Sequence, residues 1–343
     1  MPPTENPSRG TSARGDDRAF VPEQARAARL VAGALVLLFA FTALYVTAFH
    51  APRPNGVDVA VVGTTAQAAR TQRALDAAVP GGFDVRRSAS EPAARAALLE
   101  TDVRGVLVPG PPRGRVLVAQ ALGAAPAEAV GTALLGAAAA TGAPAVVQDV
   151  RPLPSGDRRG LSPLFSVLGT LIPSLVFGVL LTIVGRGLPA RVRWGAIGAY
   201  AVLAGLVTAF NVDVLVGALP GDFAGIAIAC GLLALAVSAA AHGLGHLGGV
   251  PGIVLAVLML MLLGVSTAGG AVTSEFEPGF YGALSQLLPP GAALTAVRNV
   301  AYFDWASTLG PLLVLGAWAA GGLTLGLLGE RFGPHVRRAT AAV

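Results

Sequence analysis

Six uncharged apolar runs divide the chain, and each has the length of a membrane-spanning helix. They cover residues 30–49, 161–185, 194–210, 223–241, 251–272 and 306–329. A helix needs about 20 residues to cross the roughly 30 Å of bilayer hydrocarbon. Because an arginine at the centre of such a helix costs about 2.5–3.5 kcal/mol, six charge-free runs predict an α-helical polytopic membrane protein with six transmembrane helices.

The first apolar run has two interpretations, because Arg26 and Arg29 precede it as they would precede the core of a signal peptide. A signal core is about 7–15 residues long and is followed by a small-x-small cleavage site. This run is longer, and Thr47–His50 does not match such a site. The pattern favours a first transmembrane helix over 23–50, after a disordered cytoplasmic arm at 1–22.

Between the first two runs, strand-like and helix-like patterns alternate. Buried strands are expected at 57–63, 83–87, 103–108, 116–119 and 145–150, and helices at 65–79, 91–99 and 126–141. Alternating strands and helices are typical of a mainly parallel sheet. We therefore predict a small extracytoplasmic α/β domain over 51–160, inserted between transmembrane helices 1 and 2.

The five remaining runs predict a helical membrane domain over 161–330, with two short helices outside the bilayer at 273–305. Phe280, Leu284 and Leu288 share one helical face, and Leu294, Val297 and Ala301 share another. Between the two faces, Pro289, Pro290 and Gly291 interrupt the helix and form a candidate hinge, to which we add Arg298. The two half-helices either enter the outer leaflet or lie flat on its surface.

Charge sets the orientation of the spans and excludes several function classes. The chain is 54% apolar and 13% charged, which disfavours a water-soluble protein. Arginines gather before the first span, at Arg186, Arg191 and Arg193, and in the tail at 331–343. Segments beside a membrane span that are rich in arginine stay in the cytoplasm, so both chain termini are expected there. The net charge of +5 does not indicate nucleic-acid binding, because these arginines follow the spans.

Residues that could carry chemistry are few. The chain contains no lysine, which excludes a Walker-type phosphate lysine, and its one cysteine, Cys230, excludes a disulfide framework. His242 and His246 have the spacing of two metal ligands on a helix, but the glutamate of a metalloprotease motif is missing, and a cytoplasmic turn is the simpler interpretation. We therefore predict no catalytic, cofactor or metal site, and no enzyme.

Short motifs near the second and sixth spans resemble those of a known family. They are Leu288-Pro289-Pro290-Gly291, Arg298-Asn299 and Tyr302-Phe303 before the last span, with Pro152-Leu153-Pro154 and Asp157…Gly160 before the second. With one span, a large external insert and five further spans, the chain resembles the ABC-2-type permeases of the YhgE/Pip-like branch. The resemblance implies a homodimer or heterodimer, a separate ATPase chain, and partner docking at Arg186, Arg191 and Arg193.

Two functions of different classes follow from this resemblance. The first is a membrane-embedded permease-like subunit that exports a hydrophobic or lipid-like compound with energy from an ATPase on another chain. The second is a non-transporting membrane scaffold or surface receptor, similar to a phage-infection protein, that acts through its external domain.

Overall fold

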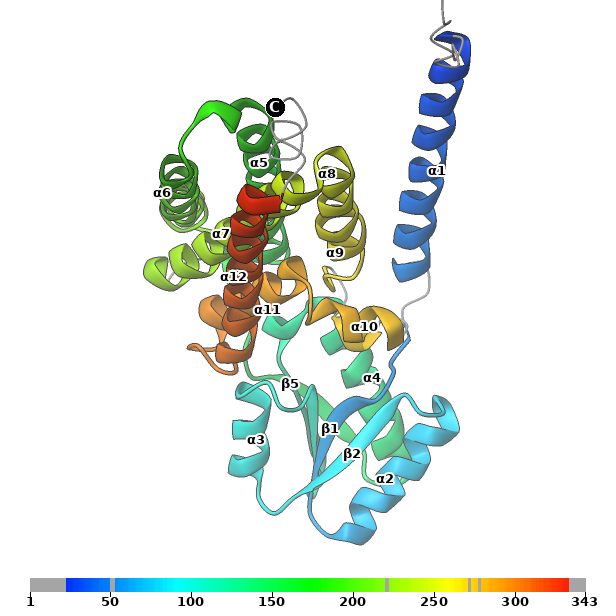
Figure 1. The fold of residues 1–343 in the computed structure, drawn as a ribbon. Coiled ribbons are helices and arrows are strands. Elements are labelled where there is room, and N and C mark those ends of the chain that lie inside the picture. The colour runs from blue at the N-terminus through cyan, green and yellow to red at the C-terminus, as the bar shows by residue number, and fades with distance from the viewer. Residues whose placement is uncertain (1–22, 50–52, 220–221, 271–272, 277–278, 333–343) are drawn as a thin grey trace, which may run out of the picture. The chain divides into compact units, whose positions relative to one another are not determined.

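The computed structural model describes residues 23–49, 53–219, 222–270, 273–276 and 279–332. The predicted arm at 1–22 lies outside the described residues, as does the predicted tail beyond Phe332. The chain divides into two units, 1–43 and 44–343, and each is described by itself. The fold is mostly helical and contains one small sheet (Figure 1).

Among the described residues, five helices are long and apolar enough to cross a membrane, which is compatible with a multi-pass membrane protein. They are α1 (Glu23–Phe49), α5 (Ser162–Val184), α6 (Ala190–Ala209), which is extended by a π-helical segment η4 (Phe210–Leu215), α7 (Phe223–Gly248) and α12 (Leu309–Phe332). They correspond to five of the six predicted runs.

The predicted run 251–272 is shorter as a helix than its sequence suggests. It forms α8 (Val250–Val257), a π-helical segment η5 (Leu258–Leu263) and α9 (Gly264–Ser266), a continuous apolar stretch of 17 residues from Val250 to Ser266. The stretch stops before Gly269, whose φ of +71° no helix interior adopts. At about 1.5 Å per residue it reaches only about 25 Å, so a sixth span stays a prediction.

The α/β domain has a five-stranded sheet in the order β2-β1-β3-β4-β5. Its strands are β1 (Val57–Val62), β2 (Phe83–Ser88), β3 (Gly105–Val108), β4 (Gly114–Val118) and β5 (Ala145–Asp149). Only β3 and β4 pair antiparallel, and the other pairings are parallel. The helices are α2 (Thr65–Ala78), α3 (Glu91–Leu99) and α4 (Ala124–Ala140). The prediction of a mainly parallel α/β sheet from alternating patterns is confirmed.

The two faces of this sheet belong to different cores, because alternate strand residues point to opposite sides. Val59 and Val116 face α2 and α4 and pack against Leu75 and Leu134. Ala60, Val106 and Leu117 face α3 on the other side, in one continuous hydrophobic cluster that also includes residues of the helical bundle. Figure 1 shows α3 on one side of the strands and α2 and α4 on the other.

Helix α7 is the central helix of the bundle, and it packs against α5, α6, α8, α11 (Pro289–Tyr302) and α12. Small residues along α7 allow these neighbours to approach closely. Gly243 illustrates this, since a Cβ on it would clash with the backbone of Gly322 in α12.

Two predicted loops are wrong, because helices continue through them. Helix α7 runs to Gly248 and includes His242 and His246, which we placed in a turn, because Gly243 and Gly245 contact neighbouring helices tightly. The predicted connection 211–222 begins only after Leu215, because η4 continues α6. Packing against neighbours here outweighs the low helix propensity of glycine.

Candidate functional site

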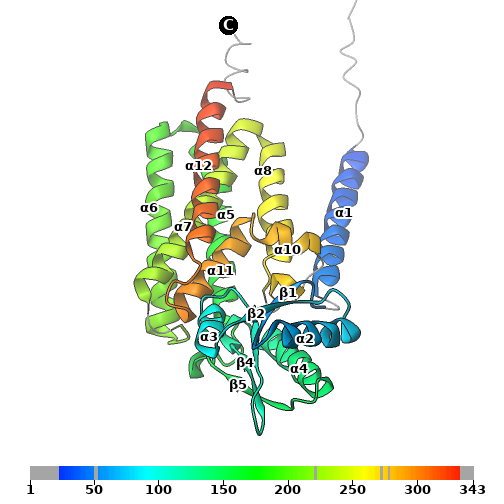
Figure 2. The same cartoon turned by 90° about the horizontal axis from the view of Figure 1, so that it is seen from below.

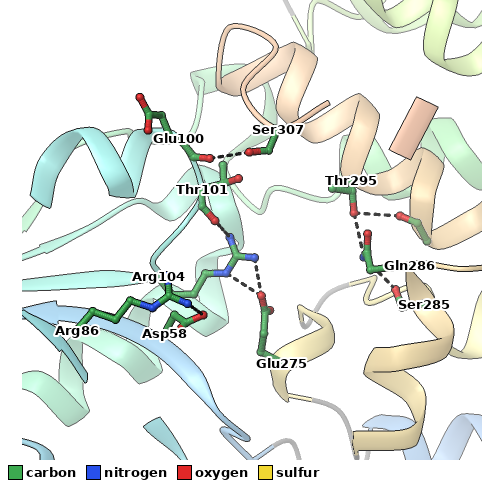
Figure 3. Close-up of polar contacts among 11 residues, drawn as sticks. Asp58, Arg86, Glu100, Thr101, Arg104, Glu275, Ser285, Gln286, Thr295 and Ser307 are labelled. Carbon is green, nitrogen blue, oxygen red and sulfur yellow. Dashed lines mark hydrogen bonds and ion pairs between the residues drawn. The ribbon is translucent and has the colours of Figure 1, made fainter. Parts of the chain in front are cut away.

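An ion pair between residues far apart in the sequence joins the α/β domain to a short segment between α9 and α11. Arg104, just before β3, donates through Nη2 and Nε to Oε1 of Glu275, at 2.5 and 2.9 Å. Glu275 lies in the short segment η6 (Ser274–Phe276), and both side chains are largely buried. Figure 3 shows the two side chains meeting between the sheet and the helices.

Segment η6 belongs structurally to the α/β domain. Phe276 is 3% exposed and lies in the same core as Val57 and Phe83. The backbone N–H groups of Arg53 and Asn55 donate to the carbonyl oxygens of Phe276 and Glu275. Sequence patterns do not reveal that η6 contributes to this core, because a single phenylalanine between two glutamates has no periodicity.

A second ion pair uses Arg151, which follows β5. Its Nη2 lies 2.7 Å from Oδ2 of Asp304, and its Nε donates to the carbonyl oxygen of Tyr302 at the end of α11. The guanidinium also lies 6.0 Å from the centre of the Phe303 ring. Because Asp304 is almost fully exposed, the ion pair itself contributes little, and the carbonyl and ring contacts fix the geometry.

The buried carboxylate of Asp157 joins the end of the α/β domain to α5 and α11. It accepts hydrogen bonds from the backbone N–H groups of Leu161 and Ser162 and, at 2.8 Å, from the Tyr302 hydroxyl. Asp157 therefore satisfies backbone N–H groups at the start of α5, where the N-cap residue Leu161 forms no side-chain cap hydrogen bond. Burial, followed by donation to Asp157, raises the pKa of Tyr302, so its hydroxyl keeps its proton.

Backbone strain gathers at the same junction. Thr101, Asp304, Trp305 and Ser307 have positive φ values between 48° and 69° although none is glycine. Such conformations persist only where surrounding contacts hold them. Here the Ser307 hydroxyl donates to the Glu100 carbonyl at 2.9 Å (Figure 3), which ties one strained loop to the other.

A polar cavity of about 180 Å³ lies inside this junction. It is lined by side chains from the α/β domain, from η6, and from α10 (Gly279–Ser285) and α11. Those that matter for its chemistry are Arg104, Thr273, Glu275, Gln286, Arg298 and Asn299. Two arginines and one glutamate leave the cavity with one unbalanced positive charge.

Arg298, a predicted site residue, lines this cavity. No residue that the structure describes forms a hydrogen bond or an ion pair with its guanidinium. Burial, followed by the neighbouring Arg104, lowers the pKa of Arg298 to about 10, so the group stays charged at neutral pH. Asn299, beside it in α11, is 2% exposed, and its Nδ2 has no hydrogen-bond partner.

Glu275 brings a free acceptor to the cavity. Burial raises its pKa, but the charge and hydrogen bonds of Arg104 outweigh burial, so the net shift is downward and the group is ionised. The Thr273 hydroxyl is near enough to favour the charged form. Thr273 Oγ1 and Glu275 Oε2 nevertheless form no hydrogen bond of ordinary geometry, and both atoms are buried without a partner.

The predicted hinge residues begin α11. Pro289 and Pro290 occupy its first turn, where a missing N–H costs nothing. All three hinge residues are buried, and a Cβ on Gly291 would clash with the carbonyl oxygen of Ser285 at the end of α10. The break between two short helices is as predicted, and it is tightly packed.

The three arginines proposed for partner docking separate into two kinds. Arg186 and Arg191 are exposed at the connection between α5 and α6. Arg193 is buried in α6, where its Nη2 lies 2.7 Å from Oε1 of Glu330 in α12. Arg193 thus joins two helices, and partner docking by these arginines stays a prediction.

A buried polar cluster surrounds this ion pair. The Nδ1 of His242 lies 3.0 Å from the Thr182 hydroxyl, and the His242 ring lies between Trp194 and His246, with ring centres 5.3 and 5.5 Å away. In the described part of the chain, no group of three or more metal-ligating side chains occurs. The two histidines are thus helix-packing residues of α7.

Comparisons with protein-family models, with curated proteins and with solved structures find no match to this chain. A function for the candidate site must therefore be inferred from the geometry of its own residues.

Proposed function

We propose that this chain is a permease-like subunit of an ABC-2-type exporter that moves a hydrophobic or lipid-like compound, with energy from an ATPase on another chain. The observation that carries the proposal is the polar cavity at the junction. Residues of the α/β domain and of α10 and α11 line it together, next to the apolar helices of the bundle. An external domain in direct contact with short helices before the last span suits a subunit that passes a compound outward.

The proposed topology places both termini and the α5–α6 connection in the cytoplasm, and 51–160 outside, with the run 251–272 as a sixth span. The positions of charged residues support it. The start of α6 and the end of α12 meet in the Arg193–Glu330 pair, and Arg186 and Arg191 lie beside them. Figure 2 shows the α5–α6 connection and the end of α12 at the end of the bundle away from the sheet. This separation agrees with the positive-inside rule.

The export proposal is tested by isolating the full-length protein from native membranes and measuring ATP hydrolysis in the purified complex. We expect a co-purifying ATPase that is lost in Arg186→Glu/Arg191→Glu, because both arginines are exposed where cytoplasmic docking is proposed. The matched control is Arg113→Glu, an exposed arginine of the α/β domain. A complex without ATPase activity, or equal loss in both variants, would contradict the proposal.

A surface groove favours the second candidate, a scaffold or receptor that acts through its external domain. Helices α2 and α4 border an apolar hollow of about 840 Å³, lined mainly by alanines such as Ala77, Ala129 and Ala133. An exposed apolar groove can receive a segment of a partner protein. The variant Ala129→Glu distinguishes the two candidates: a scaffold loses its activity, whereas an exporter retains both its ATPase and its export.

A further inference from the structure

We propose that the junction cavity binds a phosphate ester that carries a hydrogen-bond donor, an ammonium or a hydroxyl group, close to the phosphate. The unpartnered groups around one small space are the basis of this inference. Arg298 offers a charged guanidinium, Asn299 offers a free amide N–H, and Glu275 offers a free carboxylate oxygen. Leaving the Asn299 amide and the Glu275 oxygen buried and unpaired is costly, and one ligand with an anionic and a donor group would satisfy them together with Arg298.

The anionic part of the ligand follows from the charge of the cavity. Arg104 already pairs with Glu275, so among the described residues that line the cavity Arg298 is the cation without an ion-pair partner. Arginine binds phosphate and carboxylate oxygens through its planar fork. Asn299 Nδ2 and Thr273 Oγ1 add donors from different elements, an arrangement that suits the several oxygens of a phosphate better than the two coplanar oxygens of a carboxylate.

The donor part of the ligand follows from Glu275. Its Oε1 accepts from Arg104, whereas its Oε2 is buried and free. The carboxylate is ionised, because Arg104 lowers its pKa despite burial. A free, ionised oxygen requires a hydrogen-bond donor, and an ammonium group supplies one well, because it carries three N–H donors and a positive charge.

Size and surroundings limit the ligand to one headgroup-sized unit. The cavity of about 180 Å³ is smaller than the roughly 300–1,000 Å³ of sites for drug-sized molecules. Leu287, beside the lining residue Gln286, is 63% exposed, and Phe280 in the preceding helix α10 is 68% exposed. Apolar chains would lie against these two side chains, so the phosphate can come from a phospholipid headgroup as well as from a free ester.

Calorimetric titration of the full-length protein, delipidated in detergent, tests the ligand class. Phosphoethanolamine should bind at least about tenfold more tightly than phosphocholine, because only the former can donate to Glu275 and a charge-assisted hydrogen bond is worth that factor or more. Acetate should not compete. Equal binding of the two esters, competition by acetate, or no binding of either would overturn the proposal.

Variants of Arg298 and Glu275 test whether these two side chains bind the ester. Arg298→Gln should lose both esters, and Arg298→Lys should recover part of the binding, whereas Arg113→Gln should bind as the wild type does. Glu275→Gln should abolish the preference for phosphoethanolamine. Thermal unfolding of each variant establishes that it is folded, and unchanged binding by Arg298→Gln would refute the site.

Native mass spectrometry with phosphatidylethanolamine identifies the source of the phosphate. Retained lipid indicates a headgroup site, and binding of the soluble ester alone indicates a free ester.

Discussion

Single buried polar residues hold the two parts of this unit together. Asp157 and Tyr302 share a hydrogen bond across the junction, and Arg104 and Glu275 form an ion pair on the domain side of it. Asp157 and Tyr302 are both about 6% exposed, and a buried carboxylate without partners would be strongly destabilising. These contacts therefore fix where the α/β domain meets α5 and α11.

Removing the Tyr302 hydroxyl tests how much its hydrogen bond to Asp157 stabilises the protein. We expect Tyr302→Phe to lower the free energy of unfolding by about 1.5–3 kcal/mol, the usual value of a hydrogen bond to a charged group. Tyr200→Phe is the control, because the Tyr200 hydroxyl only accepts a long hydrogen bond of 3.4 Å from Ser174. Thermal unfolding in one detergent compares the two, and an equal loss in both would contradict a special role for Tyr302.

The sequence predicts some site residues and not others, for a physical reason. Arg298 and the break at Pro289–Gly291 can be recognised in the sequence. A charged residue beside an apolar helical face and two consecutive prolines are both local features of the chain. Arg104 and Glu275 do not stand out, because their pairing joins residues 171 positions apart. For the same reason Arg193 appeared to be a loop arginine until its partner Glu330 in α12 was known.

Periodicity predicts whole elements well where local pattern and packing agree. The predicted helix 91–99 is observed as α3, with the same bounds, and Ser90 accepts from Ala93 N–H at its start. In the helical bundle, helix ends are predicted less well from the sequence. Glycines there are typical of loops, but in the structure they lie at close contacts between helices. Gly322 in α12 lies against the backbone of Ala239 and Ala240 in α7.

The contact between α7 and α12 makes a prediction for neighbouring glycines. Gly322→Ala should destabilise the protein by about 1–3 kcal/mol, as overpacking does, because its Cβ would clash with α7. Gly321→Ala should be neutral or stabilise by up to about 1 kcal/mol, because nothing lies within 4 Å of that position. Melting temperatures measured in one detergent check both values. Similar melting temperatures for the two variants would contradict the close contact.

At the scale of the whole molecule, the α/β domain and the bundle share structure and are not independent. One face of the sheet lies in the same hydrophobic cluster as residues of α7 and α11, and Phe276 completes the domain core from a distant segment. The boundary 51–160 from the sequence therefore describes a stretch of chain and omits part of the domain. Alternating patterns cannot reveal a core that two distant segments build together.

The Arg104–Glu275 pair makes the attachment of segment η6 to the rest of the α/β domain pH-dependent. The pKa of Glu275 is lowered in the folded protein, so its contribution is full above the unfolded value of about 4.3 and is lost as the pH falls through the folded value. Glu275→Gln should be less stable than the wild type at pH 7, and the difference should shrink below about pH 4.3. Limited proteolysis across this range measures it, with Asp304→Asn, from the exposed pair, as control. A difference independent of pH would contradict the assignment.

The central claim is that the α/β domain and the arginine-bearing ends of α5 and α6 lie on opposite sides of a membrane. Cysteine labelling of intact cells tests it most directly. In a Cys230→Ala background, single cysteines replace Arg113 in the α/β domain and Leu188 between α5 and α6, both exposed positions. A membrane-impermeant maleimide should label the cysteine at 113 in intact cells and the one at 188 only after lysis. Labelling of position 188 from outside, or protection of position 113, would contradict the account.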